Sequence, residues 1–179
     1  MRFESFDFAP EILRAISDCG YQEMTPVQSQ AIPAIRRGRD VLASAQTGTG
    51  KTAAFALPIL QRLVDNPAPV QPSNARVLIL TPTRELAAQV ASNINDFAKY
   101  LDITTLTIVG GGKQDVQAKK LKAGAHIIVA TPGRLLEHLT ACNLSLSGVE
   151  TLVLDEADRI LDMGFSADVQ QILQAVNKT

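Results

Sequence analysis

AQTGTGKT, from Ala45 to Thr52, follows the apolar run VLAS (41–44) and precedes a stretch with helical periodicity. Gly48 and Gly50 can adopt a positive φ, so successive backbone N–H groups can converge on phosphate oxygens. Lys51 adds a positive charge at the same place. The strict form of this pattern begins with glycine, and the chain has the small residue Ala45 there, which still fits. The stretch therefore predicts a phosphate-binding loop between a strand and a helix.

An acidic segment, VLDEAD (153–158), completes this prediction. The apolar run that precedes it predicts a strand with Asp155 and Glu156 at its carboxyl end, where α/β sheets bind ligands. Carboxylates attract magnesium, and the hydroxyl group of Thr52 can also bind a metal ion. The two segments together indicate a site for a magnesium nucleoside triphosphate.

Five apolar runs set the fold class. They are rich in Val, Ile and Leu without polar alternation, which is typical of parallel strands buried on both faces. Helical apolar patterns separate them, so we expect an α/β protein with a mostly parallel sheet and helices on both faces. The expected strands are 41–44, 76–81, 104–109, 126–131 and 151–155.

Composition limits the class of protein. A chain of 179 residues with 46% hydrophobic content and a mean hydropathy of +0.09 can bury one sizeable core. A net charge of −1 provides no general positive field for nucleic acid, so any such binding depends on local geometry. Cys19 and Cys142 form no disulfide or zinc pattern, and no signal peptide or membrane span is evident. We expect a cytoplasmic protein without a membrane partner.

Three turns after expected strands are suited to phosphate. TPTR (81–84) and TPGR (131–134) each place an arginine near the start of a helix, where the helix dipole disfavours a cation. An external phosphate would account for a cation at these positions, although both turns can also be read as ordinary helix caps. Gly110–Gly112 lets a backbone approach closely at the same sheet edge. The three turns together suggest a polyphosphate chain as ligand.

The N-terminal segment offers a possible base-binding group. GYQEMTPVQ (20–28) predicts a helix that starts near Thr25 and projects Gln28 from its first turn. A glutamine amide can pair with the edge of adenine, and a surface glutamine is the alternative. Three phenylalanines precede this segment, and they can form a stacking platform or pack onto the core. We expect core packing for two of the three, which are Phe3, Phe6 and Phe8.

The ordered motifs GYQEMTPVQ, AQTGTGKT, PTRELA, GG, TPGR and DEAD resemble the N-terminal RecA-like domain of a DEAD-box RNA helicase. The resemblance covers essentially the whole chain, and its wording is closest to bacterial RhlE-type members. It implies a RecA-like fold with a Q-motif segment over residues 1–32 and an ATP-binding domain over 33–179. It also implies ATP and Mg²⁺ as cofactors and RNA, bound independently of sequence, as partner.

The resemblance implies roles for individual residues. Phe3 would stack on adenine, Gln28 would read its edge, and Thr52 and Asp155 would hold magnesium. Lys51 would contact the β and γ phosphates, Glu156 would activate the attacking water, and Asp158 would connect the nucleotide site to later motifs. The implied nucleotide-binding stretch comprises Ala45, Gln46, Thr47, Gly48, Thr49, Gly50, Lys51 and Thr52. The implied RNA contacts are Pro82, Thr83, Arg84, Gly111, Gly112, Thr131, Gly133 and Arg134.

The chain departs from the family pattern after the DEAD segment. The family continues with a strand bearing Ser-Ala-Thr and with a second RecA-like domain, and neither is present before Thr179. We therefore expect a fragment that alone is weakly active or inactive, because arginines of the second domain are missing. The absent strand would lie between 41–44 and 151–155, so both should lack a pairing partner. Two alternatives stay open, namely another P-loop enzyme such as a kinase or transport ATPase, and a non-catalytic ATP-dependent RNA clamp.

Overall fold

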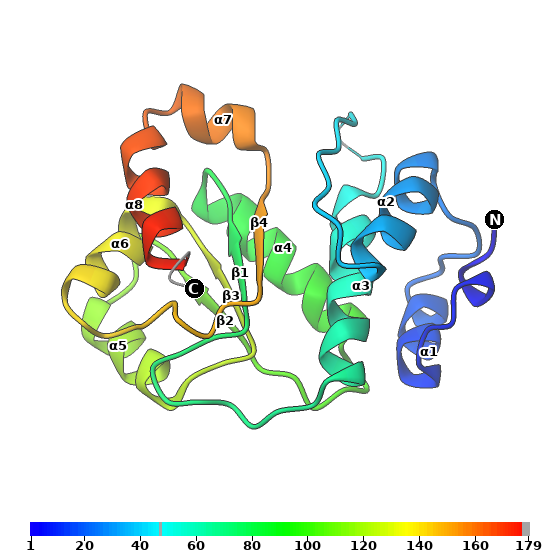
Figure 1. The fold of residues 1–179 in the computed structure, drawn as a ribbon, viewed down its shortest axis with the longest axis horizontal. Coiled ribbons are helices and arrows are strands. Elements are labelled where there is room, and N and C mark those ends of the chain that lie inside the picture. The colour runs from blue at the N-terminus through cyan, green and yellow to red at the C-terminus, as the bar shows by residue number, and fades with distance from the viewer. Residues whose placement is uncertain (47, 177–179) are drawn as a thin grey trace. The chain divides into compact units, whose positions relative to one another are not determined.

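The chain forms two compact units in a computed structural model that describes residues 1–46 and 48–176 (Figure 1). The first unit comprises Met1–Ala68 and Ser92–Asp102, and the second comprises Pro69–Ala91 and Ile103 onward. The predicted boundary between residues 32 and 33 does not coincide with this division and stays a prediction. Thr47, one of the predicted nucleotide-binding residues, lies outside the described residues.

Helices make up the first unit. A 3₁₀ turn over Phe3–Ser5 precedes α1 (Pro10–Asp18), α2 (Pro26–Arg36) and α3 (Lys51–Asp65), and the end of α4 (Arg84–Phe97) belongs here too. Helix α2 packs along α3. Phe3 and Phe8 are 1% and 5% exposed, which confirms core packing for two of the three N-terminal phenylalanines.

A four-stranded parallel sheet organises the second unit. Its strands are β1 (Val77–Leu80), β2 (Thr105–Ile108), β3 (Ile127–Ala130) and β4 (Thr151–Leu154), in the order β2-β3-β1-β4. Every pairing is parallel, with Val77 opposite both Ile127 and Thr151. The connecting helices are α5 (Gln114–Ala123), α6 (Pro132–Thr140), α7 (Ala157–Asp162) and α8 (Ser166–Val176). The predicted α/β class with a parallel sheet is confirmed.

Alternation along the strands gives the sheet two buried faces. Leu78 and Leu80 of β1 pack into a core with Leu121 of α5, Leu135 of α6 and Ile172 of α8. Ile79, between those two leucines, points to the opposite face because strand side chains alternate, and it is fully buried. The connection from β1 to β2 through α4 crosses the sheet in the opposite direction from the connections through α5 and α6, so right-handed crossovers place the start of α4 on that other face. Helices on both faces explain why β1 and β3 are apolar at every position.

The predicted strand at 41–44 is wrong for this structure. These residues have no regular secondary structure, and Val41 and Leu42 are 40% and 99% exposed. Among the described residues, β4 pairs only with β1 and no strand pairs with 41–44. A strand gains its hydrogen bonds from a neighbouring strand, so an apolar run without such a neighbour does not form a strand.

Candidate functional site

The predicted phosphate loop in the first unit has the backbone that anion binding requires. Gly48 and Gly50 have φ values of +83° and +82°, and Gly50 is the N-cap of α3. Lys51 and Thr52 are the first two residues of this helix, whose first turn holds no acidic residue. The unpaired N–H groups at the helix start and the positive end of its dipole favour a phosphate. These residues fit a nucleotide polyphosphate and a magnesium ion bound to it.

Gln28 holds this loop from a neighbouring helix. Its side chain is 3% exposed, so the alternative of a surface glutamine is wrong. The Oε1 atom accepts from the Thr25 backbone N–H at 3.0 Å, and Nε2 donates to the Gly50 carbonyl at 3.2 Å. A Cβ atom on Gly50 would overlap the Gln28 amide. The amide keeps one lone pair and one N–H beyond these two bonds, so its capacity for adenine is not exhausted.

Phe3 lies differently from what adenine stacking requires. Its ring is 1% exposed and stacks on Tyr21, with ring centroids 6.3 Å apart. Tyr21 in turn contacts Phe97 at the end of α4. As the ring lies here, neither face is open to a base.

The acidic segment lies at the end of β4 in the second unit. The Asp155 N–H donates to the Leu80 carbonyl at 2.9 Å, which continues the pairing of β4 with β1 by one residue. Glu156 is the N-cap of α7 with a φ of +51°, and its Oε2 atom lies 3.0 Å from Nη1 of Arg159. Asp158 is exposed in the first turn of this helix. A left-handed conformation costs a non-glycine residue about 1–3 kcal/mol, and such residues concentrate at functional positions.

The two halves of the predicted nucleotide site belong to different units. The phosphate loop is in the first unit, and Asp155 and Glu156 are in the second. Among the described residues, no group of three or more His, Cys, Asp or Glu side chains could hold a metal ion. Magnesium bound through phosphate oxygens needs only one or two carboxylates, so this finding does not argue against Asp155 as a ligand. A joint site with Thr52 and Asp155 stays a prediction.

The three predicted RNA-binding turns do lie at one edge of the sheet. They follow the carboxyl ends of β1, β2 and β3, which are parallel neighbours. The Arg84 guanidinium lies against Gly111, where a Cβ atom would overlap Nη1, and Gly111 has a φ of +84°. Arg134 contacts the same turn, Gly110–Gly112, which we call the glycine turn. Its Nη1 atom donates to the Gly112 carbonyl at 2.9 Å. Both arginines therefore contact the glycine turn.

The two TPxR turns are less alike than their sequences suggest. The Thr83 hydroxyl accepts from the Leu86 N–H at 3.2 Å, so α4 begins only at Arg84. In the second turn, Gly133 stands where the first turn has Thr83, so no hydroxyl group can cap the helix there. Helix α6 therefore begins one residue earlier in its motif, at Pro132, with Thr131 as its N-cap. Pro82 is buried, while Thr83, Thr131 and Gly133 are half-buried. Because these residues are buried or half-buried, only part of their surface is accessible to a ligand.

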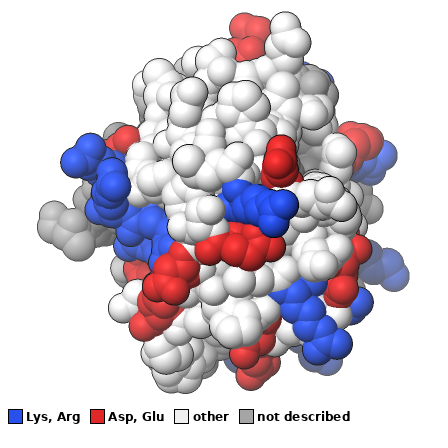
Figure 2. All heavy atoms as spheres, turned by 90° about the vertical axis from the view of Figure 1, so that its right-hand side faces the viewer, with Lys and Arg blue, Asp and Glu red and all other residues white. Residues whose placement is uncertain are grey.

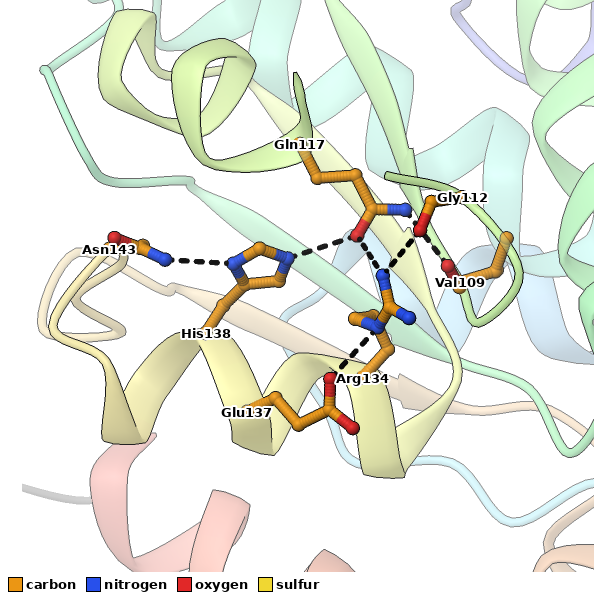
Figure 3. Close-up of polar contacts among 7 residues, drawn as sticks. All are labelled: Val109, Gly112, Gln117, Arg134, Glu137, His138 and Asn143. Atoms are coloured by element: carbon orange, nitrogen blue, oxygen red, sulfur yellow. Dashed lines mark hydrogen bonds and ion pairs between the residues drawn. The ribbon is translucent and has the colours of Figure 1, made fainter. Parts of the chain in front are cut away.

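Sequence reasoning missed a polar network behind these turns (Figure 3). It connects Gln117 of α5 with Arg134 and His138 of α6 and continues to Asn143. His138 is fully buried, and the sequence alone indicates no chemistry for it. The signal that could have revealed it is the spacing of Arg134 and His138, because residues i and i+4 share one helix face.

The environment of His138 makes stability depend on pH. Burial lowers the pKa of this imidazole from 6.5, and the charge of Arg134 lowers it further, while Glu137 acts in the opposite direction. The folded state therefore binds the proton more weakly than the unfolded state. The stabilisation is complete above pH 6.5 and is lost as the pH falls from 6.5 through the lowered pKa.

We expect the urea midpoint of the unaltered chain to fall more between about pH 7.5 and 5.5 than that of His138→Gln, because only the unaltered chain titrates at this position. His126 is common to both chains and cancels in the comparison. Parallel midpoint curves for the two chains would show that His138 is not the group responsible.

The surface charge agrees with the nearly neutral composition. On the face that Figure 2 shows, basic and acidic side chains are interspersed. No helix within the described ranges combines the length and the apolar character needed to cross a membrane.

Comparison with known proteins decides the family. A family model described as "DEAD/DEAH box helicase" matches residues 25–179. The chain belongs to the DEAD/DEAH box helicase family. It is 48% identical over 178 residues to "ATP-dependent RNA helicase DeaD" of Buchnera aphidicola subsp. Baizongia pistaciae, covering 98% of this chain. It is 46% identical over 171 residues to "ATP-dependent RNA helicase SrmB" of Haemophilus influenzae, covering 96%, and 46% identical over 175 residues to DeaD of Escherichia coli K12, covering 97%.

The DEAD-box chain spans only part of these relatives. It covers 29% of the Buchnera protein, 39% of the Haemophilus protein and 27% of the E. coli protein. The names of these relatives do not decide the narrower resemblance to RhlE-type members.

Proposed function

We propose that this chain is the ATP-binding domain of an RNA helicase, which binds Mg-ATP and the backbone of single-stranded RNA. The observation that carries the proposal is the phosphate loop, in which Gly48 and Gly50 have positive φ directly before Lys51 and Thr52. Membership of the DEAD/DEAH box family agrees with it. Hydrolysis of ATP would be used to remodel short RNA duplexes.

Each nucleotide-binding residue has a defined role in this proposal. The loop backbone and Lys51 bind the phosphates, and Thr52 and Asp155 hold the magnesium ion, which would neutralise charge on the phosphates. Gln28 would bind the adenine edge while it supports Gly50. Glu156 would orient and deprotonate the attacking water, and Asp158 would connect this site to the rest of the protein.

RNA would bind at the three turns of the second unit. The backbone N–H groups of Thr83, Gly111, Gly112 and Gly133 can donate to the sugar-phosphate chain. Pro82 has no N–H and can only lie against that chain. Such contacts read no base, which fits binding that is independent of sequence. Few positive charges are involved, so we expect weak affinity with a shallow salt dependence.

Turnover would require a second RecA-like domain. An arginine supplied by another domain accelerates P-loop hydrolysis by about 10³- to 10⁵-fold, so the 179-residue chain alone should be nearly inactive. The small share of each relative that the chain covers leaves room for such a domain in those proteins.

A chimera tests the proposal. Residues 1–179 replace the matching segment of E. coli DeaD, to which the chain is 46% identical. We expect Mg-ATP hydrolysis that single-stranded RNA stimulates, measured by phosphate release. Hydrolysis without any stimulation by RNA would favour a different P-loop enzyme, and ATP binding without hydrolysis would favour an RNA clamp.

Substitution of Gln28 tests the adenine assignment. We expect Gln28→Ala to narrow the preference for ATP over GTP by about 1–3 kcal/mol, because a two-sided amide pair is lost. Calorimetric titration of the 179-residue chain with both nucleotides measures this. Gln30→Ala, on the same helix, is the matched control. Equal weakening for ATP and GTP would limit Gln28 to its observed support of Gly50.

A further inference from the structure

Gln117 is the centre of the polar network behind the glycine turn (Figure 3). Its side chain is 8% exposed, and its Nε2 atom donates to the Val109 carbonyl at 2.8 Å. Its Oε1 atom lies 3.1 Å from Nη1 of Arg134 and 3.0 Å from Nε2 of His138. A buried amide that uses both ends in this way stabilises one arrangement of the groups around it.

The same contacts fix the tautomer of His138. An amide oxygen only accepts, so the Nε2 atom of His138 must carry the proton and donate to Gln117. The Nδ1 atom is then the acceptor for Nδ2 of Asn143 at 3.1 Å. The neutral imidazole therefore satisfies both of its neighbours.

The two arginines at the glycine turn differ in exposure. The Arg134 side chain is 16% exposed, and its Nε atom lies 2.9 Å from a carboxylate oxygen of Glu137. Its Nη1 atom is shared between Gly112 and Gln117. The Arg84 side chain is 62% exposed, and its ion-pair partner among the described residues is Glu85, at 3.5 Å. A phosphate can reach Arg84 far more easily than Arg134.

The turn itself is packed against this network. A Cβ atom on Gly112 would lie 2.8 Å from Nε2 of Gln117. The turn is thus held from the buried side by Gln117 and Arg134, and Arg84 lies against Gly111.

We propose that Gln117 and His138 are positioning residues for RNA binding, which fix Arg134 on the Gly112 carbonyl and so hold the glycine turn in its phosphate-binding shape. Arg84 is then the arginine that neutralises a phosphate, and Arg134 acts from within the protein. This inference rests on the proposed RNA-binding function, and it changes the role of Arg134 from an RNA contact to a support of the turn.

The salt dependence of RNA binding separates the two roles. Binding of a fluorescent single-stranded oligouridine to the 179-residue chain is measured by anisotropy from about 25 to 200 mM salt, a range over which screening changes strongly. We expect Arg84→Ala to reduce the slope of log K against log salt by about 0.7, the loss of one phosphate contact on a single strand. We expect Arg134→Ala and Gln117→Met to weaken binding about three- to tenfold with the slope unchanged, because one turn-supporting hydrogen bond is lost in each. A reduced slope for Arg134→Ala would overturn the proposal, because this arginine would then contact phosphate.

Matched variants control for simple loss of structure. Gln171→Met changes an exposed glutamine of α8 and should bind RNA as the unaltered chain does. His138→Phe keeps the ring and removes the donor, so it should weaken binding, while His138→Gln keeps a donor and should recover part of the loss. All variants are compared at a temperature where denaturation curves show them folded. Equal affinity for Gln117→Met and the unaltered chain would overturn the positioning role.

The backbone amide signals of Gly111 and Gly112 in nuclear magnetic resonance spectra give a readout without RNA. We expect Gln117→Met and His138→Phe to shift both signals, and Gln171→Met to leave them in place. Unchanged signals would overturn the positioning role whether or not RNA binds. If these signals shift but the unaltered chain and Arg84→Ala show no RNA binding, the proposed function fails and the observed support of the turn stands.

Discussion

Replacing Glu156 by glutamine should reduce ATP turnover of the DeaD chimera by about 10²- to 10⁴-fold, the usual contribution of a positioned general base. The amide keeps the size of the side chain and can still accept from Arg159, as the carboxylate does at 3.0 Å. Only the basicity is lost, so Mg-ATP and RNA should bind nearly as before. Steady-state phosphate release and nucleotide titration on the same preparation measure both properties.

The control for this variant is Glu11→Gln, an exposed glutamate of α1 that should leave turnover unchanged. Near-normal turnover for Glu156→Gln would assign the base to another group. Loss of nucleotide binding together with turnover would instead give Glu156 a structural role at the start of α7.

Replacing Lys51 by alanine should weaken Mg-ATP binding by about 10- to 150-fold, since a hydrogen bond to a charged partner contributes about 1.5–3 kcal/mol. Lys51 is the first residue of α3, directly after the left-handed Gly50, so its charge lies at the anion-binding end of the helix. AMP, which lacks the β and γ phosphates, should lose little affinity. Calorimetric titration of the 179-residue chain with both nucleotides measures the difference.

Lys119→Ala, on the exposed surface of α5, is the matched control and should bind Mg-ATP normally. An equal loss of affinity for Mg-ATP and AMP in Lys51→Ala would contradict the assignment of Lys51 to the terminal phosphates.

Local patterns in the sequence were sufficient for much of the fold. The runs that became β1 to β4 are dense in β-branched and aliphatic residues, and each is followed by a turn that starts a helix. The positive φ of Gly48 and Gly50 was also predictable, because only that conformation lets the loop N–H groups converge. In both cases the cause lies within a few residues of the effect.

The features that were missed depend on distant parts of the chain. Leu42 looked like a strand residue, but the described residues include no partner strand to pair with its backbone. The sequence around Gln28 is also compatible with an exposed side chain. Burial of the Gln28 amide becomes favourable because the carbonyl of Gly50, 22 residues later, accepts its hydrogen bond. Gln117 and His138 meet only after β3 brings α5 and α6 together. Pairing across such separations leaves no periodic signal in a single sequence.

At Glu156, the left-handed backbone lowers the stability of the folded state, while the proposed chemistry requires the glutamate carboxylate. Glycine, or asparagine to a lesser degree, adopts this conformation with less strain than glutamate. A library of variants selected only for resistance to heat should therefore accumulate glycine or asparagine at position 156, and its members would lose the carboxylate proposed to activate water. Selection for thermostability in this domain should accordingly exclude residue 156 from randomisation.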